Sequence, residues 1–406
     1  MNNIYLDNAA TTSVDPEVLK EMLPYFSKKY GNPMSIHSFG QESLEAVDRA
    51  RNQAADFLNC KPDEIIFTSG ATESNNLAIK GFIKSYYFGL KKNSPKENPH
   101  IITSAFEHHC VMESIKFLEK SGQAEVTYLP VYKDGVVRIE DIKNSIKPNT
   151  ALVSIMYVNN EIGTVQPIAE IGEIIREHHS QFSNPKSKIL FHTDATQAVN
   201  YFDCDVEKLN VDLLSLSGHK IYGPKGVGLL YVRKGTPISR IQDGGEQEFK
   251  MRSGTHNVPG IVGLGFAIKK AQDAKNKIQE IINLRNYFIE KVLKEIPGSH
   301  LNGSKEKRSP NNINFRFDNA EGESLVLALD QEGIAASTGS ACSSGTLEPS
   351  HVLLALGLKP EQCHGSLRLT PGRETTRKEI DCAIDKLKEV VKRLRDISGS
   401  VLEEFN

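Results

Sequence analysis

The sequence predicts an α/β protein: a large domain with a mostly parallel seven-stranded sheet, followed by a smaller α+β C-terminal domain. Seven short apolar runs have the length and the β-branched content of buried parallel strands. Helical patterns lie between many of these runs, and such alternation indicates βαβ crossovers. Beyond residue 260 the pattern changes to that of an α+β domain. Ligands of open parallel sheets bind at the carboxyl ends of the strands, so we expect the functional site there.

The elements follow in order along the chain. Large-domain strands are expected at Glu64–Thr68, His100–Ser104, Glu125–Val131, Ala151–Val158, Lys188–Thr193, Leu213–Leu216 and Gly228–Val232. Helices are expected at Ser43–Leu58, Thr72–Phe82, Val111–Lys120, Ile139–Ile146, Ile168–His178 and, as one long helix, Ile261–Glu295. The small domain should contain strands Asn312–Phe317 and Gly365–Thr370, helix Ser324–Glu332, and a charged helix from Thr376 to about Arg395. We therefore assign residues 15–260 to the large domain, and residues 1–14 and 261–406 to the small domain.

The composition excludes several classes of protein. The 51 acidic and 49 basic residues give a net charge of −2, which argues against a dedicated nucleic-acid binder. No apolar run is long enough to span a membrane. The N-terminus lacks the basic region and apolar core of a signal peptide. We expect a cytoplasmic protein whose six scattered cysteines are reduced.

The segment Phe67–Asn76 is the first that indicates a ligand. It reads FTSGATESNN, so a strand ends, a turn of small residues follows and a helix begins. Free backbone N–H groups and the helix dipole make such a turn suitable for a phosphate. An ordinary capped helix start explains the pattern equally well, so this segment alone leaves both interpretations open.

Two polar residues follow predicted strands elsewhere. Asp194 lies in the segment HTDATQ, and Lys220 ends the segment SLSGHK. The glycines at 223–228 do not fit the phosphate loop G-x-x-x-x-G-K-[ST], so we reject a nucleoside triphosphatase. A phosphate site, an acid for a ring nitrogen and a lysine for an aldehyde are together what pyridoxal 5'-phosphate requires. The residues therefore predict this cofactor.

Further motifs extend nearly along the whole chain, to Arg373 at least. They are YLDNAATT at 5–12, GNP at 31–33, EHH at 107–109, VNNEIG at 158–163, TDATQ at 193–197, SGHK at 217–220, RSGT at 252–255 and GSACSSG at 339–345. Together they resemble cysteine desulfurases, pyridoxal-phosphate enzymes of the aminotransferase superfamily (fold type I). The GSAC form on a longish loop is similar to the group I, NifS/IscS-type enzymes. The resemblance implies removal of sulfur from L-cysteine, which leaves L-alanine and a persulfide on Cys342.

The resemblance also implies a role for each matching residue. Lys220 would form the Schiff base, Asp194 would keep the pyridine nitrogen protonated, and His108 would stack on the ring and help to move protons. Gln197 would bind the phenolic oxygen of the cofactor. The phosphate would lie between Ala71, Thr72, Ser217 and His219.

The substrate and the second subunit involve other matching residues. Asn160 would contact the cofactor and, with Arg368, hold the substrate carboxylate through a bidentate fork. Thr255 would reach the phosphate of the other subunit, which implies a homodimer. The acceptor of the persulfide would be a protein such as an iron–sulfur scaffold. The short C-terminal tail leaves open whether sulfur goes to iron–sulfur clusters, to tRNA thiolation or elsewhere.

Cys342 is the thiol expected to carry out chemistry. Small polar residues surround it, and such loops give the mobility and access that a travelling nucleophile requires. It could also ligate an iron–sulfur cluster transiently, whereas no zinc-like ligand spacing accompanies His108 and His109. The other thiols are expected to be structural, except Cys363, which we expect to be idle at the surface. The structural thiols would be Cys60, Cys110, Cys204 and Cys382.

Two alternatives remain beside the desulfurase. A selenocysteine lyase, an aminotransferase or a kynureninase-like hydrolase could use the same scaffold, although transamination needs no thiol such as Cys342. A non-catalytic sulfur-relay module could retain the fold, but the presence of both Lys220 and Asp194 argues against it. Products formed from cysteine and from selenocysteine would separate the enzymes.

Overall fold

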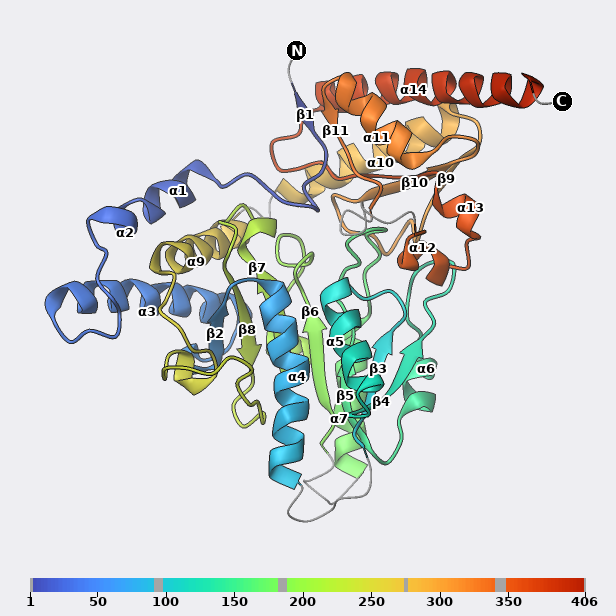
Figure 1. Cartoon of the computed structure of the whole chain (residues 1–406). Helices are drawn as coiled ribbons and strands as arrows, with labels where there is room; N and C mark the ends of the chain where they lie inside the picture. The colour runs from blue at the N-terminus through green and yellow to red at the C-terminus, as the bar shows by residue number, and fades with distance from the viewer. Residues whose placement is uncertain (1–2, 91–97, 182–187, 274–276, 340–347, 405–406) are drawn as a thin grey trace.

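The structure is a computed structural model, and it describes residues 3–90, 98–181, 188–273, 277–339 and 348–404. The main sheet has seven strands in the order β2-β8-β7-β6-β5-β3-β4 (Figure 1). Only β8 runs antiparallel to its neighbours β2 and β7, so the prediction of a mostly parallel seven-stranded sheet is confirmed. The strands are β2 (Ile65–Thr68), β3 (His100–Ser104), β4 (Glu125–Leu129), β5 (Thr150–Ser154), β6 (Leu190–Asp194), β7 (Leu213–Ser217) and β8 (Gly228–Val232).

Helices cover both faces of this sheet, because successive side chains of a strand point to opposite faces. On one face, Ile101 and Leu152 pack among residues of α4 (Ala71–Leu90) and α5 (His109–Lys120). The next residues along the same strands, Ile102 and Val153, belong to the large core on the other face. That core also takes side chains from α3 (Ser38–Leu58), α7 (Ile168–Gln181), α8 (Val206–Leu209) and α9 (Val258–Asp273).

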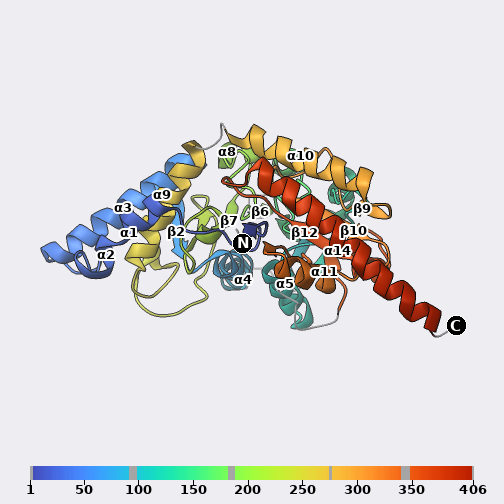
Figure 2. The same cartoon turned by 90° about the horizontal axis from the view of Figure 1, so that it is seen from above.

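A second core lies above the main sheet, beneath the long helix α14 (Figures 1 and 2). Phe288 and Phe315 are fully buried at its centre. Ile4 and Leu6 join it from the other end of the chain, because β1 pairs in parallel with β11. Its elements are β1 (Ile4–Tyr5), α10 (Ile278–Glu295), β9 (Ser299–Leu301), β10 (Ile313–Phe317), α11 (Gly322–Gln331), β11 (Ile334–Ala335), β12 (Ser366–Leu369) and α14 (Arg377–Glu404).

The expectation of one helix over Ile261–Glu295 is wrong. The structure has two helices there, α9 and α10, which end and begin at Asp273 and Ile278. They serve different cores, because α9 packs on α3 whereas α10 packs on α14. The predicted domain boundaries stay a prediction, and this packing leads us to propose a division after α9 rather than before it.

Several of the remaining elements also pack on the large core. Helices α1 (Pro16–Met22) and α2 (Pro24–Ser27) lead from the small core to α3, and Figures 1 and 2 show all three on an arm at one side. The others are α6 (Ile139–Ser145), α12 (His351–Ala355), α13 (Pro360–Cys363) and the short 3-10 turns η1 (Pro62–Glu64), η3 (Gly218–Lys220) and η4 (Glu248–Lys250). Within the described ranges, no helix has the length and apolar character that a membrane crossing needs.

Candidate active site

A cavity of about 560 Å³ lies between the carboxyl ends of the strands and the second core. Ten of the residues singled out from the sequence line it: Ala71, Thr72, His108, Asn160, Asp194, Gln197, Ser217, His219, Lys220 and Arg368. Thr255 is exposed and does not line it. Cys342 falls outside the described residues. The sequence thus identified most of one site, although its members are spread over nearly 300 positions.

The first turn of α4 forms one wall of the cavity. Ala71 and Thr72 stand at the start of this helix, where backbone N–H groups have no acceptor within the helix. Gly70 precedes them with a φ of +151°, and a side chain on Gly228 would collide with the Gly70 backbone. The two glycines allow β8 and the turn to approach closely. The wall therefore presents free N–H groups to an anion.

Asp194 ends β6 at the floor of the cavity and is buried. Its carboxylate accepts hydrogen bonds from the Asn75 side-chain amide (2.7 Å) and the Thr196 backbone N–H (2.9 Å). Both donors are neutral, and no ion pair to Asp194 occurs among the described residues. A buried carboxylate without a cation favours a positively charged group beside it.

Lys220 reaches the cavity from η3, immediately after β7. Its ammonium donates to the backbone carbonyls of Ala9 and Ala10, each at 2.6 Å. The Gln197 amide donates to the same Ala9 carbonyl at 3.0 Å. The N-terminal segment thus fixes the lysine end of the cavity. This connection brings the YLDNAATT motif beside SGHK, although Ala9 and Lys220 are 211 positions apart.

Ser217 and His219 precede this lysine in the chain and also line the cavity. Burial, together with the charges of Lys220 and Lys225, lowers the pKa of His219 to about 4. The His219 ring is therefore neutral at pH 7, and its Nδ1 lies 3.2 Å from the Thr11 hydroxyl. Ser217 ends β7 as a buried hydroxyl that also lines the cavity.

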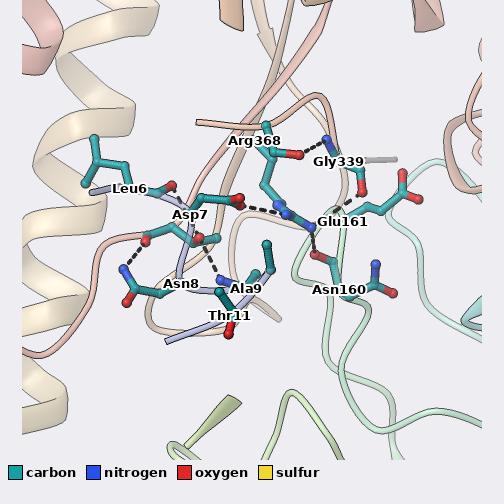
Figure 3. A network of polar contacts seen from close by, with 12 residues as sticks. Leu6, Asp7, Asn8, Ala9, Thr11, Asn160, Glu161, Gly339 and Arg368 are labelled. Carbon is teal, nitrogen blue, oxygen red and sulfur yellow. Dashed lines mark hydrogen bonds and ion pairs between the residues drawn. The ribbon is translucent and has the colours of Figure 1, made fainter. Parts of the chain in front are cut away.

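Arg368 approaches from β12 on the opposite side and is buried. Its guanidinium donates to the Asp7 carboxylate at 2.8 Å and to the Asn160 backbone carbonyl at 2.9 Å (Figure 3). The Gly339 carbonyl lies farther away, at 3.5 Å. The Nε atom of Arg368 is buried without an acceptor among the described residues. A partly satisfied guanidinium beside a cavity retains capacity for an anionic ligand.

The chain on both sides of Cys342 also borders the cavity. Gly339 and His351 line it, although residues 340–347 are not described. The Ser350 hydroxyl donates to the buried Glu161 carboxylate at 2.6 Å, and the His351 Nε2 donates to the Glu107 carbonyl at 2.9 Å. These two bonds attach the start of α12 to the large-domain wall.

Glu107 shows how strongly this wall excludes water. Burial, assisted by the negative charge of Asp194, raises the pKa of Glu107 to about 8. Its carboxyl accepts from the Ser104 hydroxyl at 2.5 Å and the Met156 N–H at 3.0 Å. Burial outweighs these two neutral donors, so the carboxyl is predominantly protonated at pH 7.

Some residues of the site carried no usable signal in the sequence. Asp7 was quoted only as part of a motif, yet it pairs with Arg368 across 361 positions. Cys110 was expected to be structural, but its thiol contacts the His108 ring and lines the cavity. Cys363 was expected at the surface, which is wrong: it is buried because α13 packs against the large core. Among the described residues, no group of three His, Cys, Asp or Glu could hold a metal ion.

The fold and the cavity together define an α/β enzyme with a lysine and a buried acid at the strand ends of its main sheet and a buried arginine on the facing side. Residues 4–382 match the family described as aminotransferase class-V. The chain is 49% identical over 396 residues to the cysteine desulfurase IscS of Dictyoglomus turgidum, covering 97% of this chain and 96% of that protein. The IscS of Methanosarcina thermophila is also 49% identical, over 99% of this chain and 95% of that protein. The chain belongs to the class-V aminotransferases, and within them to the IscS-type cysteine desulfurases.

Solved structures agree with this assignment. A NifS-like protein superimposes with a TM-score of 0.87 at 35% identity, covering 96% of this chain and all of that one. A structure described as SspA in complex with cysteine gives a TM-score of 0.76 at 37% identity, covering 92% of this chain and all of that one. The predicted fold type I architecture is therefore confirmed.

Proposed function

We propose that this protein is a pyridoxal-phosphate-dependent cysteine desulfurase that converts L-cysteine to L-alanine and leaves a persulfide on Cys342. One structural observation supports this proposal in addition to the family assignment. Lys220, Asp194 and Arg368 converge on a cavity whose wall also includes Gly339 and His351, which flank the segment of Cys342. A lysine, an acid, a carboxylate-binding group and a thiol are the functional groups that this reaction needs.

The residues present fit pyridoxal phosphate. Within the part of the chain that the structure describes, the buried Asp194 carboxylate has only neutral donors, and it suits a protonated pyridine nitrogen. Ala71 and Thr72 offer free N–H groups, and Ser217 and His219 offer side chains, to the phosphate. When bound, the cofactor supplies an aldehyde for Schiff bases and a ring that acts as an electron sink.

The other chemical steps belong to the residues of this chain. Arg368 would hold the substrate carboxylate with the help of Asn160, and the Lys220 amine would take the proton from the substrate α-carbon. The Cys342 thiolate would then attack the substrate sulfur, forming an S–S bond as the Cβ–S bond breaks. The electron pair left on carbon takes up a proton, so that L-alanine leaves and the sulfur remains on the enzyme. His108, which lines the cavity, would exchange protons with the reacting groups.

The substitution Cys342→Ser tests this assignment. Cofactor binding should persist, with its yellow absorbance band intact, while alanine and sulfide production from cysteine falls to background. Cys382→Ala is the matched control. The expectation that Cys382 is structural is wrong, because this thiol is exposed on α14, and it should be dispensable. Wild-type turnover by Cys342→Ser would overturn the proposal. Comparing cysteine with selenocysteine as substrate separates a desulfurase from a selenocysteine lyase.

The lysine assignment has a separate test. Borohydride reduction should fix the cofactor covalently to the wild-type chain but not to Lys220→Ala. Lys225→Ala is the matched control, because Lys225 lines the same cavity without following the strand end directly. Covalent fixation in Lys220→Ala would mean that another lysine forms the Schiff base.

We also propose a homodimer in which Thr255 contributes to the phosphate site of the partner subunit. Thr255 is exposed, as such a contact requires. The segment from Leu23 to Phe39 exposes an apolar patch that would suit a second copy of this chain. Its most exposed members are Ile36 (95%), Tyr30 (66%) and Phe26 (60%). Sedimentation of Ile36→Asp should show monomers if this patch is the interface.

The acceptor of the persulfide stays a prediction, as does the cytoplasmic location. We propose a protein acceptor such as an iron–sulfur scaffold, with no role for nucleic acid or a membrane. Transfer of ³⁵S from the persulfidated enzyme to a purified scaffold protein would support this acceptor. Retention of the label on Cys342 in the presence of scaffold would contradict it.

A further inference from the structure

A chain of hydrogen bonds runs along the cavity wall from Asp194 to His108. The Asn75 amide nitrogen donates to Asp194 Oδ2 at 2.7 Å and to the Cys110 sulfur at 3.1 Å. The Cys110 sulfur in turn lies 2.9 Å from Nδ1 of His108. Asn75 is fully buried, whereas Cys110 is partly buried and lines the cavity. The residues come from β6, α4 and α5, and the helices meet the strand at the cavity floor.

The direction of every bond in this chain is fixed by its ends. A carboxylate only accepts, so the Asn75 atom that faces Asp194 is the NH₂ group, which has a second hydrogen for the sulfur. At the other end, the Cys110 backbone N–H donates to Nδ1 of His108 at 3.2 Å. Nδ1 is therefore an acceptor. The Cys110 sulfur, which already accepts from Asn75, completes the pattern by donating its S–H proton to Nδ1.

We propose that Cys110 is a positioning residue that holds His108 in the tautomer with its proton on Nε2. Both donors at Nδ1 oppose the other tautomer and the imidazolium, because either would place a proton on Nδ1. The ring consequently presents an Nε2–H group to the cavity. This inference rests on the proposed function only for its catalytic consequence. The tautomer itself is a property of the chain.

The surroundings of His108 also disfavour the imidazolium, because overall they lower the pKa of this histidine. Burial lowers the pKa of His108, and the positive charges of Lys220 and of protonated His109 and His351 lower it further. Asp194 opposes this effect. Asn75 and Cys110, however, stand between Asp194 and the ring, and they present hydrogen-bond donors where a carboxylate would attract a proton. The polar chain thus separates the cofactor acid from the proton-transferring histidine.

The thiol also has a fixed state. Burial and the negative charge of Asp194 raise the pKa of Cys110 to about 12, although hydrogen bonds from Asn75 and Thr72 oppose this shift. The sulfur therefore keeps its proton at neutral pH and can act as a donor. A Cys110 thiolate would have no proton to donate, so it would face the acceptor Nδ1 of His108 without a hydrogen bond. Cys110 is accordingly suited to hold the ring and unsuited to act as a second sulfur carrier.

The test compares Cys110→Ala, Cys110→Ser and the control Cys382→Ala. Cofactor-free protein carrying ¹⁵N-histidine is studied by solid-state NMR, and the His108 signals are those lost in His108→Gln. Wild type and Cys110→Ser should show His108 protonated on Nε2, since serine keeps the side-chain donor. Cys110→Ala should show a mixture of tautomers and a higher pKa for His108. Cys382→Ala should match wild type.

Kinetics of the holoenzyme supply the second readout. Cys110→Ala should lower kcat for alanine formation by roughly three- to ten-fold, the loss expected for one neutral hydrogen bond, and move the acid limb of the pH profile upward. Cys110→Ser should restore both. A wild-type proton on Nδ1, or an unchanged tautomer in Cys110→Ala, would overturn the proposal. Those outcomes are independent of the desulfurase assignment, which fails if the wild type forms no alanine from cysteine or if Cys342→Ser keeps wild-type turnover.

Discussion

Two buried arginines, Arg51 and Arg368, show how the same side chain can serve stability or ligand binding. Arg51 forms a two-pronged ion pair with Glu248, with N–O distances of 2.9 and 2.6 Å, and donates to the Ile65 carbonyl at 2.5 Å. Arg368 makes one contact with Asp7 at 2.8 Å and leaves its Nε without an acceptor among the described residues. Both are at most 6% exposed. Burial alone therefore does not identify a functional arginine, whereas unused donor capacity beside a cavity does.

The carboxylates of the two pairs differ in the same way. Glu248 is buried and also accepts from the Phe67 N–H and the His256 ring, each at 2.7 Å. Asp7 accepts from a single guanidinium and is partly exposed, at 18% of its side chain. The pair of Arg51 closes a network between α3, β2 and η4. The pair of Arg368 holds a charged side chain in place at the cavity wall (Figure 3).

The largest effect on stability is expected when the ion pair between Arg51 and Glu248 is broken. Arg51→Met should lower the free energy of unfolding by roughly 3–5 kcal/mol, because it leaves Glu248 as a buried, uncompensated charge. Urea denaturation of the cofactor-loaded protein measures this loss. The double variant Arg51→Met with Glu248→Gln should recover part of it, since no charge then stays buried. A loss below 1 kcal/mol would mean that Arg51 is as replaceable as a surface residue.

The pH dependence of the same pair gives the next effect. Hydrogen bonds from His256 and Arg51, and the charge of Arg51, outweigh burial and lower the pKa of Glu248 to about 2. Because the folded pKa is below the unfolded value near 4.5, this stabilisation is present above pH 4.5 and is lost as the pH falls through about 2. The shift corresponds to roughly 3 kcal/mol. Wild type should therefore lose its stability advantage over Glu248→Gln between pH 5 and 2, as followed by denaturation.

Substitution of Arg368 should affect activity rather than stability. Arg368→Lys keeps the positive charge but loses the planar fork, so kcat/KM for L-cysteine should fall roughly a hundred-fold. The unfolding free energy should change far less than in Arg51→Met. Steady-state alanine formation and urea denaturation measure the two quantities on one preparation. An unchanged kcat/KM would show that Arg368 does not bind the substrate carboxylate.

The sequence could reveal the local parts of this comparison but not the long-range ones. Asp194 and Lys220 were predictable because each lies at the end of a strand or within a few residues of it, and strand ends of a parallel sheet meet at one edge. Arg51 and Glu248 lie 197 positions apart, and nothing in the local pattern indicates their contact. The Cys110–His108 contact was missed although only two positions separate the residues. Its direction depends on Asn75 and Asp194, which only the tertiary fold brings together.

The break between α9 and α10 has a similar origin. The amphipathic pattern continues from one helix to the next, so periodicity predicted a single element. Tertiary packing decides otherwise, because α9 contacts α3 and α1 whereas α10 contacts α14 and β9. The expectation for Cys363 failed for the same reason, since a polar-looking loop turned out to carry α13 onto the large core.

The smallest effect is expected from the acid partner of Arg368, and it sharpens the contrast with Glu248. Asp7→Asn removes the negative charge but keeps an oxygen that can accept from the guanidinium. Because Asp7 is partly exposed, its charge is screened and the ion pair is worth little beyond orientation. The KM for L-cysteine should therefore change by no more than about three-fold. Asp7→Ala also removes the acceptor. It should raise KM further, because the Arg368 guanidinium then loses the hydrogen bond that orients it. If Asn and Ala at this position behave alike, charge rather than orientation is what Asp7 contributes, and the two ion pairs would differ less than their geometry indicates.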